Sequence, residues 1–282
     1  LMNAPERELP LSKLFSRYLL RLVAALSVWA ALYECLRIWM LRGSAPLPTL
    51  LRLAGQNWLT GNTYFHLYYF YFAIGLYLAL PLTRLICRYA SRGELRYSVL
   101  LFLVTGVLLP FLQYFFPFSQ GGPSLLRFIL PPVFASAGLG LLGWYLLRTP
   151  SRGILPSFFL LLGSFVAEFL FTWQRSTTEG ALNMILLDGF SPTSVLMAVG
   201  IFRLAQALSQ RWDLPLFVAF LSRASFCVYL IHPFFQWLAR QSFFEALPPL
   251  WSIPLQALLL LGLSLCAYLV LCRIPVVNRW LI

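Results

Sequence analysis

The feature that most limits the possible folds of this chain is a series of apolar runs, each about 20 residues long, separated by short connections. A helix of that length spans the roughly 30 Å of hydrocarbon in a lipid bilayer. Membrane-spanning strands would instead need about ten residues of alternating polarity, and the runs show no such alternation. We therefore expect an all-α fold, a polytopic bundle of transmembrane helices.

The sequence predicts about eight such helices. Their expected ranges are 18–41, 64–83, 97–117, 126–148, 154–174, 189–208, 217–239 and 252–273. The composition agrees, because only 11% of the residues are charged, against about 25% in soluble domains. The short connections leave no room for a soluble domain, so residues 1–282 are expected to form a single membrane domain.

The basic residues are distributed unevenly between the two sides of this bundle. With eight spans, fifteen of the 21 lysines and arginines fall on one side and six on the other. The positive-inside rule then places both termini in the cytoplasm. Because the basic residues form no continuous face, the +12 net charge does not indicate binding to nucleic acid. The expected partner is the lipid bilayer.

Ionisable residues within the spans are the first candidates for function. His66 and His232 both fall in the outer half of the predicted bundle, and Glu34 reaches a similar depth. Arg37 follows Glu34 by three residues, a spacing that allows an ion pair on one helix face. Because a buried charge is costly, these side chains and Glu168 are expected to face the interior of the bundle. Structural hydrogen bonds, or snorkelling to the headgroups, are the alternative interpretation.

Three other patterns carry less functional weight. Gly138, Gly140 and Gly143 match a dinucleotide-binding spacing, but they lie inside an apolar span with no preceding strand. Close helix packing is the better interpretation of these glycines. Ser222 and Ser225 have no suitably placed acid for a catalytic triad with His232. The sequence shows no Cys/His cluster with metal-ligand spacing, so no metal site is predicted.

Two segments resemble the membrane acyltransferase 3 family. The first is His66-Leu-Tyr-Tyr-Phe followed by Ile74-Gly-Leu-Tyr-Leu-Ala-Leu-Pro-Leu-Thr-Arg84, and the second is Ser225-Phe-Cys-Val-Tyr-Leu-Ile-His-Pro233. The basic segment from Phe15 to Arg21 is similar to the entry to the third helix of that family. The similarity is closest to the bacterial branch that includes the O-acetyltransferase of enterobacterial common antigen. On this resemblance the chain lacks the first two helices of the family, with their arginine and the histidine thought to act in acyl transfer.

The resemblance implies transfer of an acyl group, usually acetyl, from cytoplasmic acyl-CoA to a hydroxyl of an envelope glycan or lipid-linked sugar. Acyl-CoA would be a substrate, and no permanently bound cofactor is expected. A hydroxyl nucleophile needs a base that works near pH 7, and the phosphates of CoA need cationic donors. The candidate catalytic residues are His232, His66 and Glu34, and positioning of the acceptor is the alternative role of the histidines. The candidate donor-binding residues are Arg17, Arg21, Arg84 and Arg88.

Two other functions remain open at this level. A transporter or flippase for a glycan intermediate would also place Glu34, Glu168 and His232 inside the bundle. The absence of an internal inverted repeat favours the enzyme. A shortened, inactive member of the family would keep the fold without the chemistry. The expected location of an active enzyme is the inner membrane of a bacterium.

Overall fold

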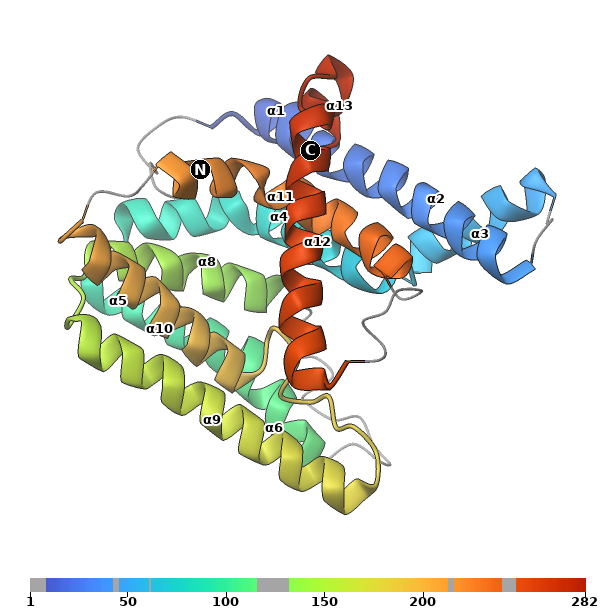
Figure 1. Cartoon of the computed structure of the whole chain (residues 1–282). Coiled ribbons are helices and arrows are strands. Elements are labelled where there is room, and N and C mark those ends of the chain that lie inside the picture. The colour runs from blue at the N-terminus through green and yellow to red at the C-terminus, as the bar shows by residue number, and fades with distance from the viewer. Residues whose placement is uncertain (1–8, 43–45, 61, 116–131, 213–215, 240–246) are drawn as a thin grey trace, which may run out of the picture. The chain divides into compact units, whose positions relative to one another are not determined.

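A computed structural model describes residues 9–42, 46–60, 62–115, 132–212, 216–239 and 247–282 (Figure 1). Every regular element in these ranges is helical. They are α1 (Leu11–Lys13), η1 (Leu14–Leu19), α2 (Leu20–Arg42), α3 (Leu47–Thr60), η2 (Phe65–Leu67), α4 (Tyr68–Tyr89), α5 (Arg92–Leu103), η3 (Val104–Leu108), α6 (Leu109–Phe115), α8 (Pro132–Arg148), α9 (Ile154–Glu179), α10 (Pro192–Ser209), α11 (Leu216–Ala239), α12 (Pro249–Leu271) and α13 (Pro275–Trp280).

The predicted all-α fold is confirmed for the described residues, and seven of the candidate spans are long and apolar enough to cross a membrane. The expected span at 126–148 is represented by α8, and residues 126–131 lie outside the described part of the chain. The eight-span topology and the cytoplasmic location of both termini therefore remain predictions. One element was missed. The segment after the first span, interpreted as a loop, contains α3 over Leu47–Thr60.

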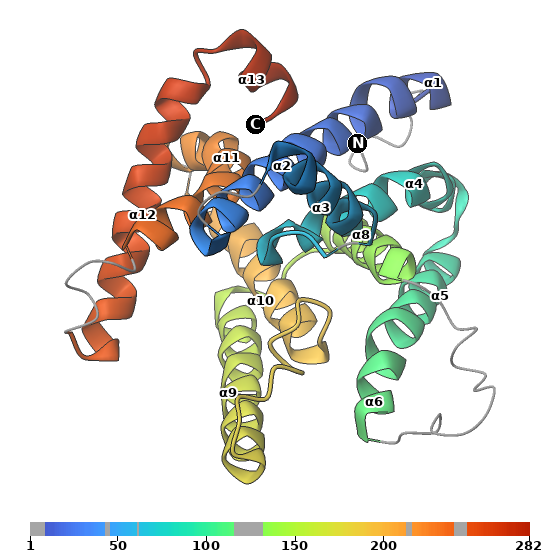
Figure 2. The ribbon, with the colours of Figure 1, turned by 90° about the vertical axis from the view of Figure 1, so that its right-hand side faces the viewer.

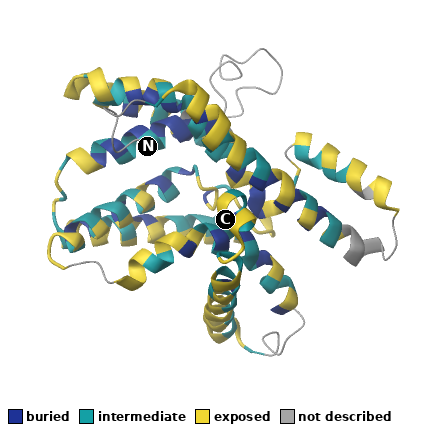
Figure 3. Ribbon diagram, turned by 90° about the horizontal axis from the view of Figure 1, so that it is seen from above, coloured by how far each residue is buried: buried dark blue, intermediate teal, exposed yellow. Residues whose placement is uncertain are grey.

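Exposed residues lie along the helices (Figure 3), and many of them are large and apolar. On α9, for example, Leu155, Phe159 and Trp173 are each more than 60% exposed. Exposed apolar area on this scale would be a liability in water but is what a lipid-facing helix requires. The surface therefore supports the interpretation that the helices lie in a bilayer.

The chain forms two compact units, of which the first comprises residues 1–11 and 72–213. Within it α9 packs along α10, and α5 packs along α8 (Figure 2). Ser191 caps α10 by accepting a hydrogen bond from the Ser194 amide at 3.1 Å, and Pro192 occupies its first turn. A Cβ atom at Gly200 would lie 2.9 Å from the Leu161 backbone, so glycine lets α9 and α10 approach closely.

The glycine-rich stretch of α8 shows the same kind of packing. A Cβ atom at Gly138 would lie 2.7 Å from Cβ of Phe102 on α5, and one at Gly106 would lie 2.7 Å from the backbone of Ala135. For Gly138, the predicted role in close helix packing is confirmed. At Gly143 an added Cβ would meet nothing within 4 Å, so this glycine has no packing role of that kind.

The second unit comprises residues 12–71 and 214–282. Within it α2 packs against α3 and α13, and α11 packs against α12. Its core includes Leu26, Leu67, Phe70 and Leu230, all at most 1% exposed. This unit contains both histidines of the chain, together with Glu34, Arg17 and Arg21.

Candidate functional site

Pro233 determines the hydrogen bonding of the neighbouring histidine. A proline inside a helix has no amide hydrogen to donate to the carbonyl four residues earlier, which here belongs to Tyr229. Nδ1 of His232 lies 2.8 Å from that carbonyl oxygen and 3.2 Å from the carbonyl oxygen of Val228. A carbonyl only accepts, so Nδ1 carries the hydrogen and Nε2 of the neutral ring keeps a free lone pair. His232 is therefore held in the tautomer that a general base requires.

His66 lies beside His232 and is buried, with 4% of its surface exposed. The two ring centroids are 5.6 Å apart and the ring planes are inclined by 73°. Among the described residues, neither ring nitrogen of His66 has a partner with hydrogen-bond geometry. Buried polar atoms are rarely left in this condition, and a catalytic or binding role is a common reason.

Aromatic side chains surround His66. The ring centroids of Tyr33, Tyr64, Phe65 and Tyr229 lie between 4.9 and 5.7 Å from that of the imidazole. The Tyr229 hydroxyl donates a hydrogen bond to the backbone carbonyl of His66, and so ties α11 to η2. These contacts fix the position of the imidazole without engaging its nitrogens.

A second tyrosine ties α2 to α11. The Tyr33 hydroxyl donates to the backbone carbonyl of Leu230 at 2.6 Å, and Tyr33 is only 3% exposed. Its ring stacks on that of Tyr64, with centroids 4.8 Å apart. Three segments that are distant in the sequence are thereby held around the two histidines.

Glu34 and Arg37 form the predicted ion pair. Glu34 is buried, and its Oε1 also accepts a hydrogen bond from Nδ2 of Asn57 at 2.9 Å. Arg37 was expected to face the interior of the bundle, and it pairs with this buried carboxylate, but 45% of its own side chain is exposed. The reason is geometric: Arg37 uses Nε and one terminal nitrogen for Glu34, and the rest of the guanidinium borders an open cavity.

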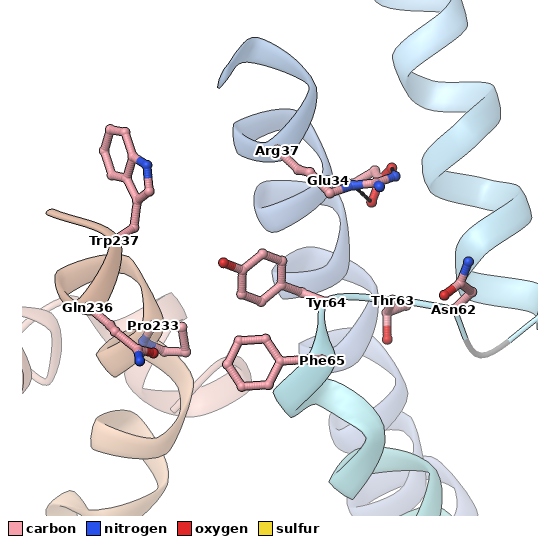
Figure 4. Close-up of a pocket in the computed structure, with 9 residues that line it drawn as sticks. All are labelled: Glu34, Arg37, Asn62, Thr63, Tyr64, Phe65, Pro233, Gln236 and Trp237. Atoms are coloured by element: carbon pink, nitrogen blue, oxygen red, sulfur yellow. Dashed lines mark hydrogen bonds and ion pairs between the residues drawn. The ribbon is translucent and has the colours of Figure 1, made fainter. Parts of the chain in front are cut away.

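This cavity of about 390 Å³ is called the aromatic cavity here (Figure 4). It is lined by Glu34, Arg37, Asn62, Thr63, Tyr64, Phe65, Pro233, Gln236 and Trp237. In Figure 4, the rings of Tyr64 and Phe65 point from their segment toward α11, which carries Pro233 and Gln236. The two histidines are sequence neighbours of lining residues: His66 follows Phe65, and His232 precedes Pro233. Polar groups on aromatic walls suit a small hydroxyl-bearing ligand.

A second cavity of about 560 Å³ lies near the other end of α2 and is called the arginine cavity. It is lined by Ser16, Arg17, Tyr18, Arg21, Arg279 and Trp280. Within the described part of the chain, no Asp or Glu side chain forms an ion pair with its three arginines, and Arg21 donates to an oxygen of Ile282. At 1.5 Å per residue, Glu34 lies about 20 Å farther along the helix than Arg21. One candidate span thus carries an anion-binding cavity toward one end and a polar aromatic cavity toward the other.

The other predicted site residues belong to the first unit. Arg84 is 9% exposed, and the guanidinium carbon of Arg88 lies 5.2 Å from the centroid of the Tyr89 ring. Glu168 is half-buried and accepts hydrogen bonds from the hydroxyls of Thr193 at 2.8 Å and Ser194 at 3.4 Å. Its bonds join α9 to the start of α10, which is the structural role offered as the alternative.

Sequence reasoning missed Tyr33 and Tyr229, which contact His66, as well as Asn57, which bonds to Glu34, and Trp237, which lines the aromatic cavity. Tyr229 precedes His232 by three residues, so a shared helix face was available as a signal. Asn57 lies on α3, which the sequence did not predict, and nothing in the sequence links it to Glu34. Sequence reasoning also did not single out Arg279 or Trp280 as candidates for a site.

Comparison with known families finds a match to the family Acyl_transf_3, described as an acyltransferase domain, over residues 1–273. Searches of curated proteins and of solved structures find no match. The family match extends over both units and includes every residue of the aromatic cavity. Together with the membrane-spanning helices, it shows that the chain belongs to the acyltransferase 3 family of membrane acyltransferases.

Proposed function

We propose that this protein is an O-acyltransferase of the bacterial inner membrane that transfers an acyl group, in the first instance acetyl, from acyl-CoA to a hydroxyl of an envelope glycan or lipid-linked saccharide. The observation that carries this proposal is the hydrogen bonding of the His232 ring. Its Nδ1 is committed to the carbonyl of Tyr229, which leaves Nε2 as the proton acceptor, and the next residue, Pro233, lines the aromatic cavity.

The aromatic cavity is the proposed acceptor site. Glu34 and Arg37 neutralise each other, so the cavity has hydrogen-bonding groups but little net charge. Such a lining suits the hydroxyl groups of a saccharide, while the faces of Tyr64, Phe65 and Trp237 suit its apolar ring face. In this scheme Glu34 positions the acceptor together with Arg37.

The arginine cavity is the proposed donor site. Arg17 and Arg21 offer planar guanidinium groups that match the oxygen geometry of phosphate. Arg84 and Arg88 belong to the other unit, and a role for them in donor binding remains a proposal based on the family resemblance. Because the two cavities lie toward opposite ends of one candidate span, donor and acceptor would reach the protein from opposite faces of the membrane.

The reaction balances with one base. Nε2 of His232 takes the proton of the acceptor hydroxyl as its oxygen attacks the thioester carbonyl of the donor. A C–O ester bond forms, the C–S bond breaks, and the proton passes to the departing thiolate of CoA. His66, packed against His232 with both ring nitrogens buried, would position the imidazole of His232 for the acceptor hydroxyl.

The decisive test uses membranes that contain the full-length protein, supplied with labelled acetyl-CoA and an extract of envelope glycans. We expect label in the glycan as an alkali-labile ester, and none with His232→Gln protein present at equal abundance. Movement of an unmodified glycan across the membrane, without ester formation, would overturn the proposal and favour the transporter. No ester from properly folded protein would favour the inactive member.

A further inference from the structure

The short C-terminal helix α13 contributes two side chains to the arginine cavity, and its position there is fixed by contacts with α2. Trp29 Nε1 on α2 donates a hydrogen bond to the backbone carbonyl of Leu281 at 3.1 Å. Arg21 donates to the backbone carbonyl of Ile282. Both contacts join segments about 250 residues apart, so α13 is a fixed wall of the cavity.

The arginine cavity has the charge of an anion-binding site. Arg17, Arg21 and Arg279 all line it, and none of its described lining residues is acidic. Three guanidinium groups around one hollow repel one another unless an anion lies between them. Arg21 spends part of its hydrogen-bonding capacity on the Ile282 carbonyl, whereas no described residue forms an ion pair with Arg17 or Arg279.

The cavity also has an aromatic wall. Trp280 lines it, and the guanidinium carbon of Arg279 lies 5.8 Å from the centroid of the Trp280 ring. An indole provides a flat apolar face for a nucleobase, and stacking of a base on an aromatic side chain is a general way to bind nucleotides. Several guanidinium groups beside one indole therefore suit a ligand that has both phosphates and a base.

We infer that α13 completes a nucleotide-binding site, in which Arg279 binds phosphate together with Arg17 and Arg21 while Trp280 stacks on the base. Resting on the proposed function, this inference adds that the ligand is the adenosine 3′,5′-bisphosphate part of the acyl-CoA donor. The remaining arm of the donor then extends away from α13. The alternative source of the same chemistry is the headgroup of an anionic phospholipid, since the cavity lies near an end of a candidate span.

The test measures binding rather than turnover. The full-length protein is placed in nanodiscs of phosphatidylcholine and titrated with adenosine 3′,5′-bisphosphate, with CoA and with pantetheine, which lacks the nucleotide. We expect Arg279→Gln to weaken binding of the bisphosphate and of CoA about tenfold, and to leave pantetheine binding unchanged. Trp280→Leu should weaken the same two ligands by a smaller factor, and Trp280→Phe should restore most of the loss.

The matched control is Arg273→Gln, which removes a positive charge from the same C-terminal segment outside the cavity. Equal effects of the two arginine substitutions would overturn the inference, because they would show a long-range charge effect only. Thermal unfolding of each variant checks that α13 remains packed on α2. Loss of packing in Arg279→Gln would be seen there, and the comparison of Trp280→Leu with Trp280→Phe then provides the test of the site.

The lipid alternative is separated by repeating the titration in nanodiscs that contain phosphatidylglycerol. If the bisphosphate binds only weakly in phosphatidylcholine, and Arg279→Gln instead reduces retention of phosphatidylglycerol, the site is a lipid site and the inference is wrong. If the bisphosphate binds through Arg279 but no acyl group is ever transferred, the nucleotide site stands and the proposed reaction fails. If acyl transfer at limiting acyl-CoA is unaffected by Arg279→Gln and by Trp280→Leu, this inference is wrong but the proposed function stands.

Discussion

The aromatic cavity and the arginine cavity lie on the same helix but differ in how their charges are balanced. In the aromatic cavity, Arg37 is paired with the buried carboxylate of Glu34, which Asn57 also holds. In the arginine cavity, Arg17, Arg21 and Arg279 pair with no Asp or Glu side chain among the described residues. An internally neutralised cavity selects ligands by hydrogen bonding and shape, whereas an unbalanced one selects by charge. The difference predicts two kinds of substrate.

The largest expected effect concerns His232, the proposed base, which precedes the lining residue Pro233. His232→Gln should lower kcat by about 10²–10⁴-fold, the usual contribution of general base catalysis, with little change in the acceptor KM. Rates measured at saturating acetyl-CoA and acceptor check this. Ser225→Ala, on the same helix, is the control, because its hydroxyl donates only to the Ser222 carbonyl. A rise in KM at unchanged kcat would instead show that His232 positions the acceptor.

The second prediction separates the two cavities by their substrates. Arg17→Gln should raise the KM for acyl-CoA about tenfold and leave the acceptor KM unchanged. Arg37→Gln should do the reverse, since Arg37 borders the aromatic cavity. Steady-state kinetics with each substrate varied in turn measure both constants. If either substitution alters the two KM values equally, the assignment of separate donor and acceptor cavities fails.

A smaller effect is expected when the hydrogen bond that supports the Glu34–Arg37 ion pair is removed. Asn57→Leu removes the second hydrogen bond to the Glu34 carboxylate, and should lower the stability of the protein by about 1 kcal/mol. Gln56→Leu is the matched control, because its exposed side chain lies on the same helix. Thermal unfolding in detergent compares the two. Equal melting temperatures would show that Asn57 contributes nothing to holding the carboxylate.

The smallest expected effect is a difference in salt dependence. Donor binding should weaken a few-fold between about 0.05 and 0.3 M NaCl, because mobile ions screen the uncompensated arginines. Acceptor binding should change much less, since Glu34 and Arg37 neutralise each other. Dissociation constants measured at both salt concentrations provide the check. A steeper salt dependence for the acceptor would reverse the comparison and point to an anionic saccharide.

The sequence was sufficient for features that depend on local spacing. The length of the apolar runs predicted the helices, and the i, i+3 spacing predicted the Glu34–Arg37 pair. The His-Pro dipeptide also contained the reason for the tautomer of His232, because Pro233 removes one amide hydrogen from the helix.

Features that depend on contacts between distant segments were not predictable in this way. Tyr33 bonds to Leu230 across 197 positions, and Trp29 bonds to Leu281 across 252 positions. The periodicity of a single sequence predicts helices, but it does not predict which distant residues form such pairs. The helix α3 was missed for a different reason: at 14 residues it is shorter than a membrane span, and the prediction used apolar runs of about 20 residues, although the amphipathic pattern of α3 is typical of a helix.

The continuity of α2 between the two cavities has a consequence for how such a protein can change over evolutionary time. Each residue turns a helix by about 100° and advances it by about 1.5 Å. One residue inserted between Arg21 and Glu34 would therefore turn either Arg17 and Arg21, or Glu34 and Arg37, away from the cavity that they line. Substitutions in this interval preserve the alignment, but single insertions and deletions do not. The number of residues between these two positions is therefore expected to vary less than their identities.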